Sequence, residues 1–133
     1  MRIYLDSAVV IYTVEQVMPF AELADARLSM AEVRAVTSDL TRLECRVKPL
    51  RQANAALLKE FDDFFEGAFE EVVPLSREVV DLATTVRAQY GFKAPDALHL
   101  GAALWSKCDV FLTNDHRLDR FGDLAIEVVG RSN

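Results

Sequence analysis

Five short apolar runs alternate along the chain with longer segments of helical periodicity. Strands are predicted over 2–5, 33–37, 70–73, 109–113 and 126–129. Helices are predicted over 8–13, 20–30, 41–48, 51–66 and 76–90, with another from Pro95 and a short turn over 117–121. Such alternation predicts an α/β fold, with a five-stranded, mostly parallel sheet flanked by helices on both faces. Because no repeat, linker or low-complexity tract interrupts it, we expect one domain over 1–133.

The last long helix carries a carboxylate at its entrance. Pro95 fits the first helical position, where its missing N–H is not needed. Asp96 follows in the first turn, at the positive end of the helix dipole. Leu98, Ala102 and Leu104 recur behind it at helical spacing, which predicts a largely buried helix. On this segment alone, the favoured interpretation is that Asp96 complements the dipole.

Three more acids occupy corresponding places along the chain. Asp6 directly follows the first predicted strand, and Asp115 comes two residues after Thr113, where the fourth strand ends. Glu44 lies in the first turn of the helix after the second strand. Ligands of such sheets bind beyond the carboxyl ends of the strands. We therefore expect all four acids to converge on one rim.

A cluster of four carboxylates needs a compensating charge. Like charges within about 4–6 Å raise each other's pKa and disfavour ionisation. Mg²⁺ or Mn²⁺, which prefer oxygen ligands, would remove that conflict. Two such ions can activate a water and stabilise the leaving oxygen in phosphodiester cleavage. The pattern therefore favours a metal-dependent hydrolase.

Each acid also has a purely structural interpretation, and these stay open. Glu44 could close a capping box with Thr41 or pair with Lys48 four residues on. Asp6 could cap the first helix, and Asp115 could be an ordinary turn residue. Pro49 is expected to kink or break its helix near Lys48.

The overall charge and the two cysteines limit the function classes further. A formal net charge of −6 does not suit a protein that coats nucleic acid by electrostatics. It is compatible with a nuclease, because cations bound at an acidic site cancel its charge. Cys45 and Cys108 form no CxxC motif, so we expect buried free thiols in a reducing compartment. No leader is recognisable and no apolar run nears the ~20 residues of a membrane span, which predicts a cytoplasmic protein without a membrane partner.

Four segments in order resemble a known family. They are 3–7 (IYLDS), 37–44 (TSDLTRLE), 93–103 (KAPDALHLGAA) and 111–118 (FLTNDHRL). Together they are similar to the PIN-domain ribonucleases, and among these to the VapC-like toxins of type II toxin–antitoxin pairs. The resemblance covers essentially the whole chain.

The resemblance implies a function and assigns roles to residues. It implies Mg²⁺- or Mn²⁺-dependent cleavage of RNA that leaves 5′-phosphate and 3′-hydroxyl ends, with a homodimer and a cognate antitoxin that blocks the site. Asp6, Glu44, Asp96 and Asp115 would be the metal-binding and catalytic acids. Asp6 and Asp96 would hold the principal ion. The supporting residues would be Ser7 and Thr113, which position carboxylates, and Asn114 behind them.

Several other residues have two interpretations each. Arg42, Lys93 and Arg117 could contact RNA phosphates or be solvated surface charge. His99 lies one turn after Asp96 and could be a catalytic base, although a packed, hydrogen-bonded histidine is the favoured interpretation. The phenylalanines at 61, 64, 65 and 69 suit a core or an antitoxin docking surface.

Other functions fit less well or stay as alternatives. A signalling receiver domain would need adjacent acids after the first strand, but Ser7 follows Asp6 there. A nucleotide-binding module would need a GxGxxG or GxxxxGK[ST] motif, which is missing. A PIN-fold RNA-processing nuclease and a non-cleaving RNA-binding subunit remain as alternatives to a toxin.

Overall fold

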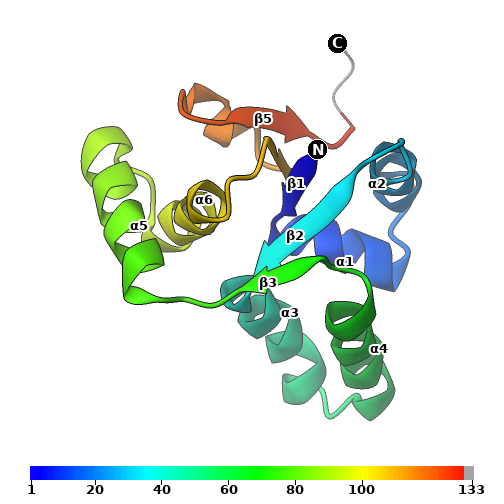
Figure 1. The fold of residues 1–133 in the computed structure, drawn as a ribbon. Helices are drawn as coiled ribbons and strands as arrows, with labels where there is room; N and C mark the ends of the chain where they lie inside the picture. The colour runs from blue at the N-terminus through cyan, green and yellow to red at the C-terminus, as the bar shows by residue number, and fades with distance from the viewer. Residues whose placement is uncertain (131–133) are drawn as a thin grey trace.

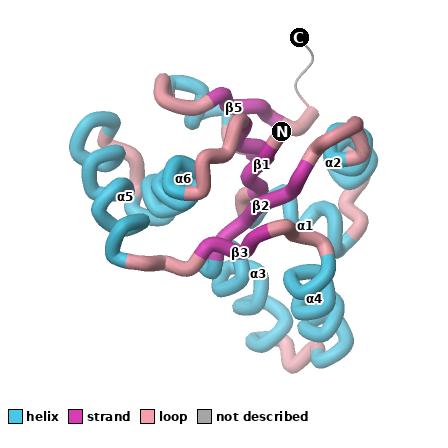
Figure 2. Tube along the Cα trace, in the orientation of Figure 1, coloured by secondary structure: helices cyan, strands magenta, loops and turns pink. Residues whose placement is uncertain are grey.

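The computed structural model describes residues 1–130, which form a parallel sheet wrapped by helices (Figure 1, Figure 2). In chain order the elements are β1 (Arg2–Leu5), α1 (Ser7–Glu15), α2 (Phe20–Leu28), β2 (Arg34–Ser38), α3 (Asp39–Arg51), α4 (Ala55–Gly67), β3 (Glu71–Val73), α5 (Arg77–Tyr90), α6 (Ala94–Trp105), β4 (Val110–Thr113), the 3₁₀ helix η1 (His116–Arg120) and β5 (Ala125–Val128). The sheet has five strands in the order β3-β2-β1-β4-β5, and every pairing is parallel. The predicted fold class is confirmed.

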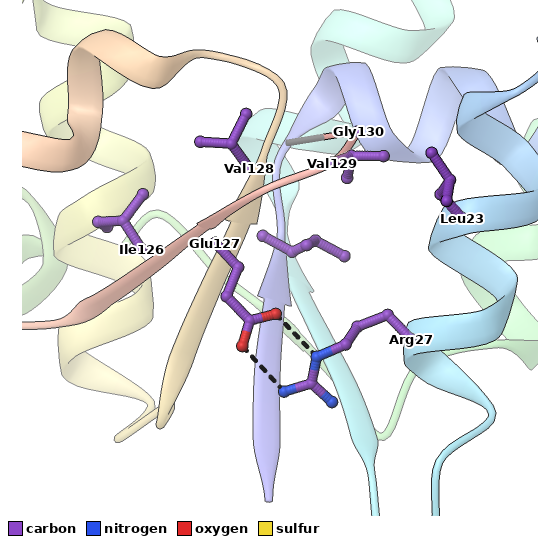
Figure 3. A pocket seen from close by; sticks show the side chains of 8 residues that line it. Leu23, Arg27, Ile126, Glu127, Val128, Val129 and Gly130 are labelled. Atoms are coloured by element: carbon purple, nitrogen blue, oxygen red, sulfur yellow. Dashed lines mark hydrogen bonds and ion pairs between the residues drawn. The ribbon is translucent and has the colours of Figure 1, made fainter. Parts of the chain in front are cut away.

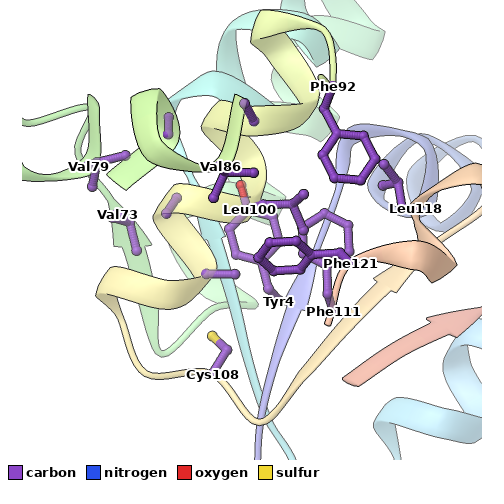
Figure 4. Packing of buried hydrophobic residues seen from close by; sticks show 14 of the residues in the cluster. Tyr4, Val73, Val79, Val86, Phe92, Leu100, Cys108, Phe111, Leu118 and Phe121 are labelled. Atoms are coloured by element: carbon purple, nitrogen blue, oxygen red, sulfur yellow. The ribbon is translucent and has the colours of Figure 1, made fainter. Parts of the chain in front are cut away.

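Successive residues of the central strands face opposite sides of the sheet, and each side has its own core. Tyr4 and Phe111 stack at 5.1 Å under α5 and α6 (Figure 4). Ile3 and Leu5 point the other way, into a core shared with α1, α2 and α4. The strands are therefore buried on both faces, as their continuous apolar runs predict.

The order of the strands reverses direction at β1, which creates a topological switch point at the carboxyl ends of the central strands. From β1 the chain moves outward through β2 to β3, then crosses back to β4 and β5 on the other side of β1. Leu5 of β1 pairs in register with Leu112 of β4, and Asp6 N–H donates to Leu112 C=O at 3.2 Å. The carboxyl ends of β1 and β4 thus lie side by side where the connections diverge, which is where such sheets bind ligands.

The second half of the fold depends on a close approach of two helices. Ser76 Oγ accepts the Val79 N–H to cap α5, and Gly91 ends that helix at φ 73°. Gly101 of α6 faces α5 so closely that an added Cβ would lie 2.9 Å from Val79 O. This contact fixes α6, the carrier of Asp96 and His99, against the rest of the domain.

The predicted boundaries around α3 and α4 are wrong. The helix begins at Asp39, with Ser38 as N-cap, and continues through Pro49 to Arg51. Pro49 lies in the last turn of this helix, three residues before the C-cap Gln52, so the expected break near Lys48 does not occur there. The break comes at residues 52–54, and Asn54 Oδ1 caps α4 by accepting the Leu57 N–H. Helix α4 therefore begins at Ala55 rather than at 51.

Other features of the described residues match or extend the predictions. Cys45 and Cys108 are both buried and unpaired, as predicted. Within residues 1–130, none of the helices has the length and apolar character to cross a membrane.

Candidate active site

The four predicted acids all lie on segments that begin at the carboxyl ends of the strands, which form one edge of the sheet. Asp6 follows β1 and is the N-cap of α1, and Asp115 follows β4 and is the N-cap of η1. Glu44 lies in the second turn of α3, and Asp96 in the first turn of α6. The fold thus brings segments that are remote in sequence to one edge.

Asp6 is held from two sides. Its Oδ1 accepts the Val9 N–H at 3.3 Å, and its Oδ2 accepts the hydroxyl proton of Thr113. The same Thr113 hydroxyl accepts the Asp115 N–H at 3.0 Å. Thr113 therefore links two of the acids, and the helix-capping interpretation of Asp6 holds alongside any functional one.

Glu44 takes neither of its structural alternatives. Its Oε1 accepts hydrogen bonds from Ser7 Oγ and from His99 Nε2, each at 2.6 Å. The proposed partner Lys48 pairs with Glu15 instead, and Thr41 lies inside the helix rather than at its N-cap. The Glu44 carboxylate is therefore oriented by residues of α1 and α6.

Behind Glu44 runs a buried polar chain that the sequence analysis missed. His99 Nδ1 lies 2.8 Å from Tyr4 Oη, which in turn lies 2.7 Å from Ser38 Oγ. His99 is 5% exposed, and both its ring nitrogens are engaged. The geometry therefore favours the packed histidine over a free base. Tyr4 offered one signal, because a tyrosine in a buried strand needs a partner for its hydroxyl.

The electrostatics show that the acids act on one another. Burial raises the pKa of Asp6, and the charge of Glu44 raises it further, although Thr113 and His99 oppose this. Burial also raises the pKa of Asp96, with Asp115 and Glu44 adding repulsion. Partial burial would raise the pKa of Glu44 too, but the hydrogen bonds from His99 and Ser7 lower it overall. The four carboxylates are thus coupled through space.

Asp115 is neutralised by an arginine two residues away. Arg117 Nε lies 2.9 and 3.1 Å from the two carboxylate oxygens, and Nη2 lies 2.6 Å from Oδ2. This fork holds the pKa of Asp115 below its usual range. A cation that recruited Asp115 would have to compete with Arg117.

The oxygen donors suit a hard divalent cation, but they are not gathered around one point. Within residues 1–130, no group of three or more Asp, Glu, His or Cys side chains is arranged as a metal site. The fit rests on donor chemistry: the raised pKa values of Asp6 and Asp96 reflect the burial and repulsion that a cation relieves. Carboxylate oxygens are also the ligands that Mg²⁺ and Mn²⁺ prefer.

Of the predicted RNA-contacting and supporting residues that remain, one lies beside an acid and two do not. Lys93 is the N-cap residue of α6, next to Asp96. Arg42 points instead to α4, with Nη2 3.9 Å from Asp62. Asn114 donates to Tyr12 Oη at 2.6 Å, so within the described residues no hydrogen bond joins it to the four acids.

A separate pocket between α2 and β5 contains none of the acids (Figure 3). Arg27 and Glu127 span it in a two-pronged ion pair with contacts of 2.7 and 3.1 Å. Because these charges satisfy each other, the pocket offers no unpaired charge to a phosphate.

Comparisons with known proteins agree with this architecture. The chain is similar to VapBC-1 from nontypeable Haemophilus influenzae, with a TM-score of 0.78 and 18% identity over 98% of this chain and 100% of that one. It is similar to VapBC2 from Rickettsia felis, bound to a promoter DNA fragment, with a TM-score of 0.76 and 16% identity over 96% and 98%.

A third similar structure is VapC20 from Mycobacterium tuberculosis, described as a Sarcin-Ricin loop cleaving toxin. Its TM-score is 0.67, with 10% identity over 82% of this chain and 86% of that one. At these identities the likeness shows the fold. No curated protein sequence matches the chain. The family model of the PIN domain matches residues 3–124, so the chain belongs to the PIN domain family.

Proposed function

We propose that this protein is a metal-dependent endoribonuclease that hydrolyses phosphodiester bonds of RNA with Mg²⁺ or Mn²⁺. One observation carries the proposal: Asp6, Glu44, Asp96 and Asp115 start from one sheet edge, and their charges are coupled. Helix capping accounts for Asp6 and Asp115 one at a time, but it gives no reason for four acids with coupled charges at one edge. It suits a reaction that needs cations beside a phosphate.

Asp6 and Asp96 would hold the principal ion, with Glu44 and Asp115 completing the site. When bound, a divalent cation lowers the pKa of a water and neutralises charge that develops on the phosphate. Thr113 keeps the Asp6 carboxylate in place, while Ser7 and His99 keep that of Glu44. Hydrogen-bonded supports of this kind reduce the reorganisation that binding requires.

We propose further that the protein is a toxin whose partner is a cognate antitoxin. Support comes from the similar structures, which include VapBC assemblies and a toxin–antitoxin complex from Klebsiella pneumoniae. The protein would then act in the cytoplasm on RNA, with the antitoxin covering the acids.

A homodimer is also part of the proposal, and the surface of α3 supports a protein partner. Leu43, Val47 and Leu50 follow one another at helical spacing, and they are 57, 40 and 57% exposed. Apolar side chains gathered on one exposed face are typical of protein contact surfaces.

The test is an RNA cleavage assay with Asp6→Asn and Asp96→Asn in Mg²⁺. Each substitution keeps side-chain size but removes a charged oxygen donor. Cleavage should therefore fall at least by the about 10–100-fold typical of residues that only support a metal ligand. Asp25→Asn, at an exposed position of α2, is the matched control and should cut like the wild type. Wild-type rates in both site variants would overturn the mechanism. RNA binding without cleavage by the wild type would favour a non-cleaving subunit.

A further inference from the structure

A small basic pocket adjoins the acids. It measures about 180 Å³ and lies between the start of α6 and η1, with Asp96 at its border. Three cationic side chains line it, those of Lys93, Arg117 and Arg120. A chain with a net charge of −6 therefore gathers positive charge next to its acidic edge.

Arg120 is fixed in place before any ligand arrives. Its guanidinium carbon lies 4.1 Å from the centre of the Phe92 ring, and its Nη1 donates to Tyr90 C=O at 2.6 Å. Phe92 is itself buried in the core beside Leu118 and Phe121 (Figure 4). A guanidinium has five N–H donors, so most of those of Arg120 remain for a ligand.

Lys93 supplies a cation without a partner. Its side chain is exposed and makes no ion pair or hydrogen bond with residues 1–130. Arg87 Nη1 donates to Phe92 C=O at 2.6 Å, which fixes the segment that precedes Lys93. Arg117 differs from both, because Asp115 already engages it.

The size of the pocket indicates what it can hold. Pockets for drug-sized ligands run to about 300–1,000 Å³, so this one is too small for a whole nucleotide. It is large enough for a phosphate group, an anion that both arginine and lysine bind. Asp96, one of the four acids, lines the same pocket, so a phosphate held there would lie beside the acidic edge.

We propose that Lys93 and Arg120 form a subsite for an RNA phosphate adjacent to the one that is cut. The inference rests on the proposed function. Lys93 and Arg120 act here as positioning residues, which fix the path of the RNA backbone across Asp96. Arg117 joins them when Asp115 is engaged elsewhere.

The experiment measures binding of a labelled single-stranded RNA oligonucleotide as a function of KCl concentration. Lys93→Gln, Arg120→Gln and the double variant are compared in an Asp6→Asn background, which prevents cutting. Each lost phosphate contact should make the plot of log affinity against log salt shallower by about 0.7, and the double variant by about 1.4. When the Lys93→Gln and Arg120→Gln substitutions are made in the otherwise wild-type protein, KM for RNA should rise about tenfold while kcat changes less than twofold.

The control is Arg77→Gln, which removes one exposed charge at the far end of α5, about 20 Å from Tyr90 along the helix. It should leave slope and KM unchanged. Arg120→Lys keeps the charge and should retain most of the slope. If Arg120→Gln does not fold, the exposed Lys93 still carries the test.

The outcomes separate this inference from the proposed function. Shallower slopes in a protein that cuts no RNA would support the subsite while the nuclease fails. Wild-type slopes in an active nuclease would overturn the subsite. Unchanged RNA binding with weakened binding of the antitoxin would also overturn it, because the pocket would then serve an acidic protein partner.

Discussion

Thr113 and His99 show how single residues hold the acidic edge together. Thr113 donates to Asp6 and accepts from the Asp115 backbone, and His99 joins Glu44 to Tyr4. Each side chain makes a hydrogen bond that favours the charged form of a carboxylate against the effect of burial. Keeping Asp6 charged is still unfavourable, because the group is buried beside another negative charge and its pKa is raised.

Asp6→Asn should therefore stabilise the metal-free protein at neutral pH. The native state raises the pKa of Asp6, so it binds more protons than the unfolded state above the ordinary value of about 3.9. In the wild type, the stability that neutral Asp6 confers on the fold is lost as the pH rises through the raised pKa. Asparagine is an equally good N-cap and stays neutral, so the variant does not lose this stability. Urea unfolding in EDTA at pH 4 and pH 7 checks this. The advantage of the variant should be larger at pH 7, and a less stable variant at that pH would contradict it.

At the scale of the elements, the contact between α5 and α6 positions half of the site. Gly101 lets the two backbones approach, and α6 carries both Asp96 and His99. Periodicity in the sequence predicts that these helices exist and which faces are buried. It does not reveal that Gly101 is a contact point, because nothing local distinguishes this glycine from a flexible one.

Gly101→Ala should separate the helices and loosen the site. The new Cβ would meet backbone atoms at 2.9 and 3.0 Å, and overpacking of this kind costs about 1–3 kcal/mol. Gly67→Ala is the matched control, since no atom lies within 4 Å of its Cβ and the substitution favours helix. The midpoint temperature of thermal unfolding and the rate of RNA cleavage should both be lower in Gly101→Ala but not in Gly67→Ala. Equal behaviour of the two variants would show that the close contact is unimportant.

The boundaries near Pro49 mark where local reasoning fails. Proline is a strong signal for a helix break, but α3 continues through Pro49 to Arg51. The N-cap residue of α3 is Ser38, one turn earlier than the Thr41 box suggested. The Ser38 hydroxyl bonds Tyr4 and not the helix, so no local capping pattern marks this start.

At the scale of the whole molecule, parallel topology explains why acids 109 residues apart in sequence, Asp6 and Asp115, share one hydroxyl partner. The alternation of strands and helices predicts this edge, because the carboxyl ends of parallel strands meet there. The chain from Ser38 through Tyr4 and His99 to Glu44 could not be predicted. Its members are distant in sequence, and only the completed sheet brings them into contact.

The most direct test of the central claim, that the four acids jointly hold a divalent cation, is thermal unfolding of the EDTA-treated protein against increasing MnCl₂ or MgCl₂. The wild type should gain stability with concentration, reaching about 2.7 kcal/mol at 100 times the dissociation constant. Asp96→Asn should lose most of this gain, while Asp25→Asn should retain it. A wild-type midpoint that neither ion moves, or an equal gain in Asp96→Asn, would contradict the account.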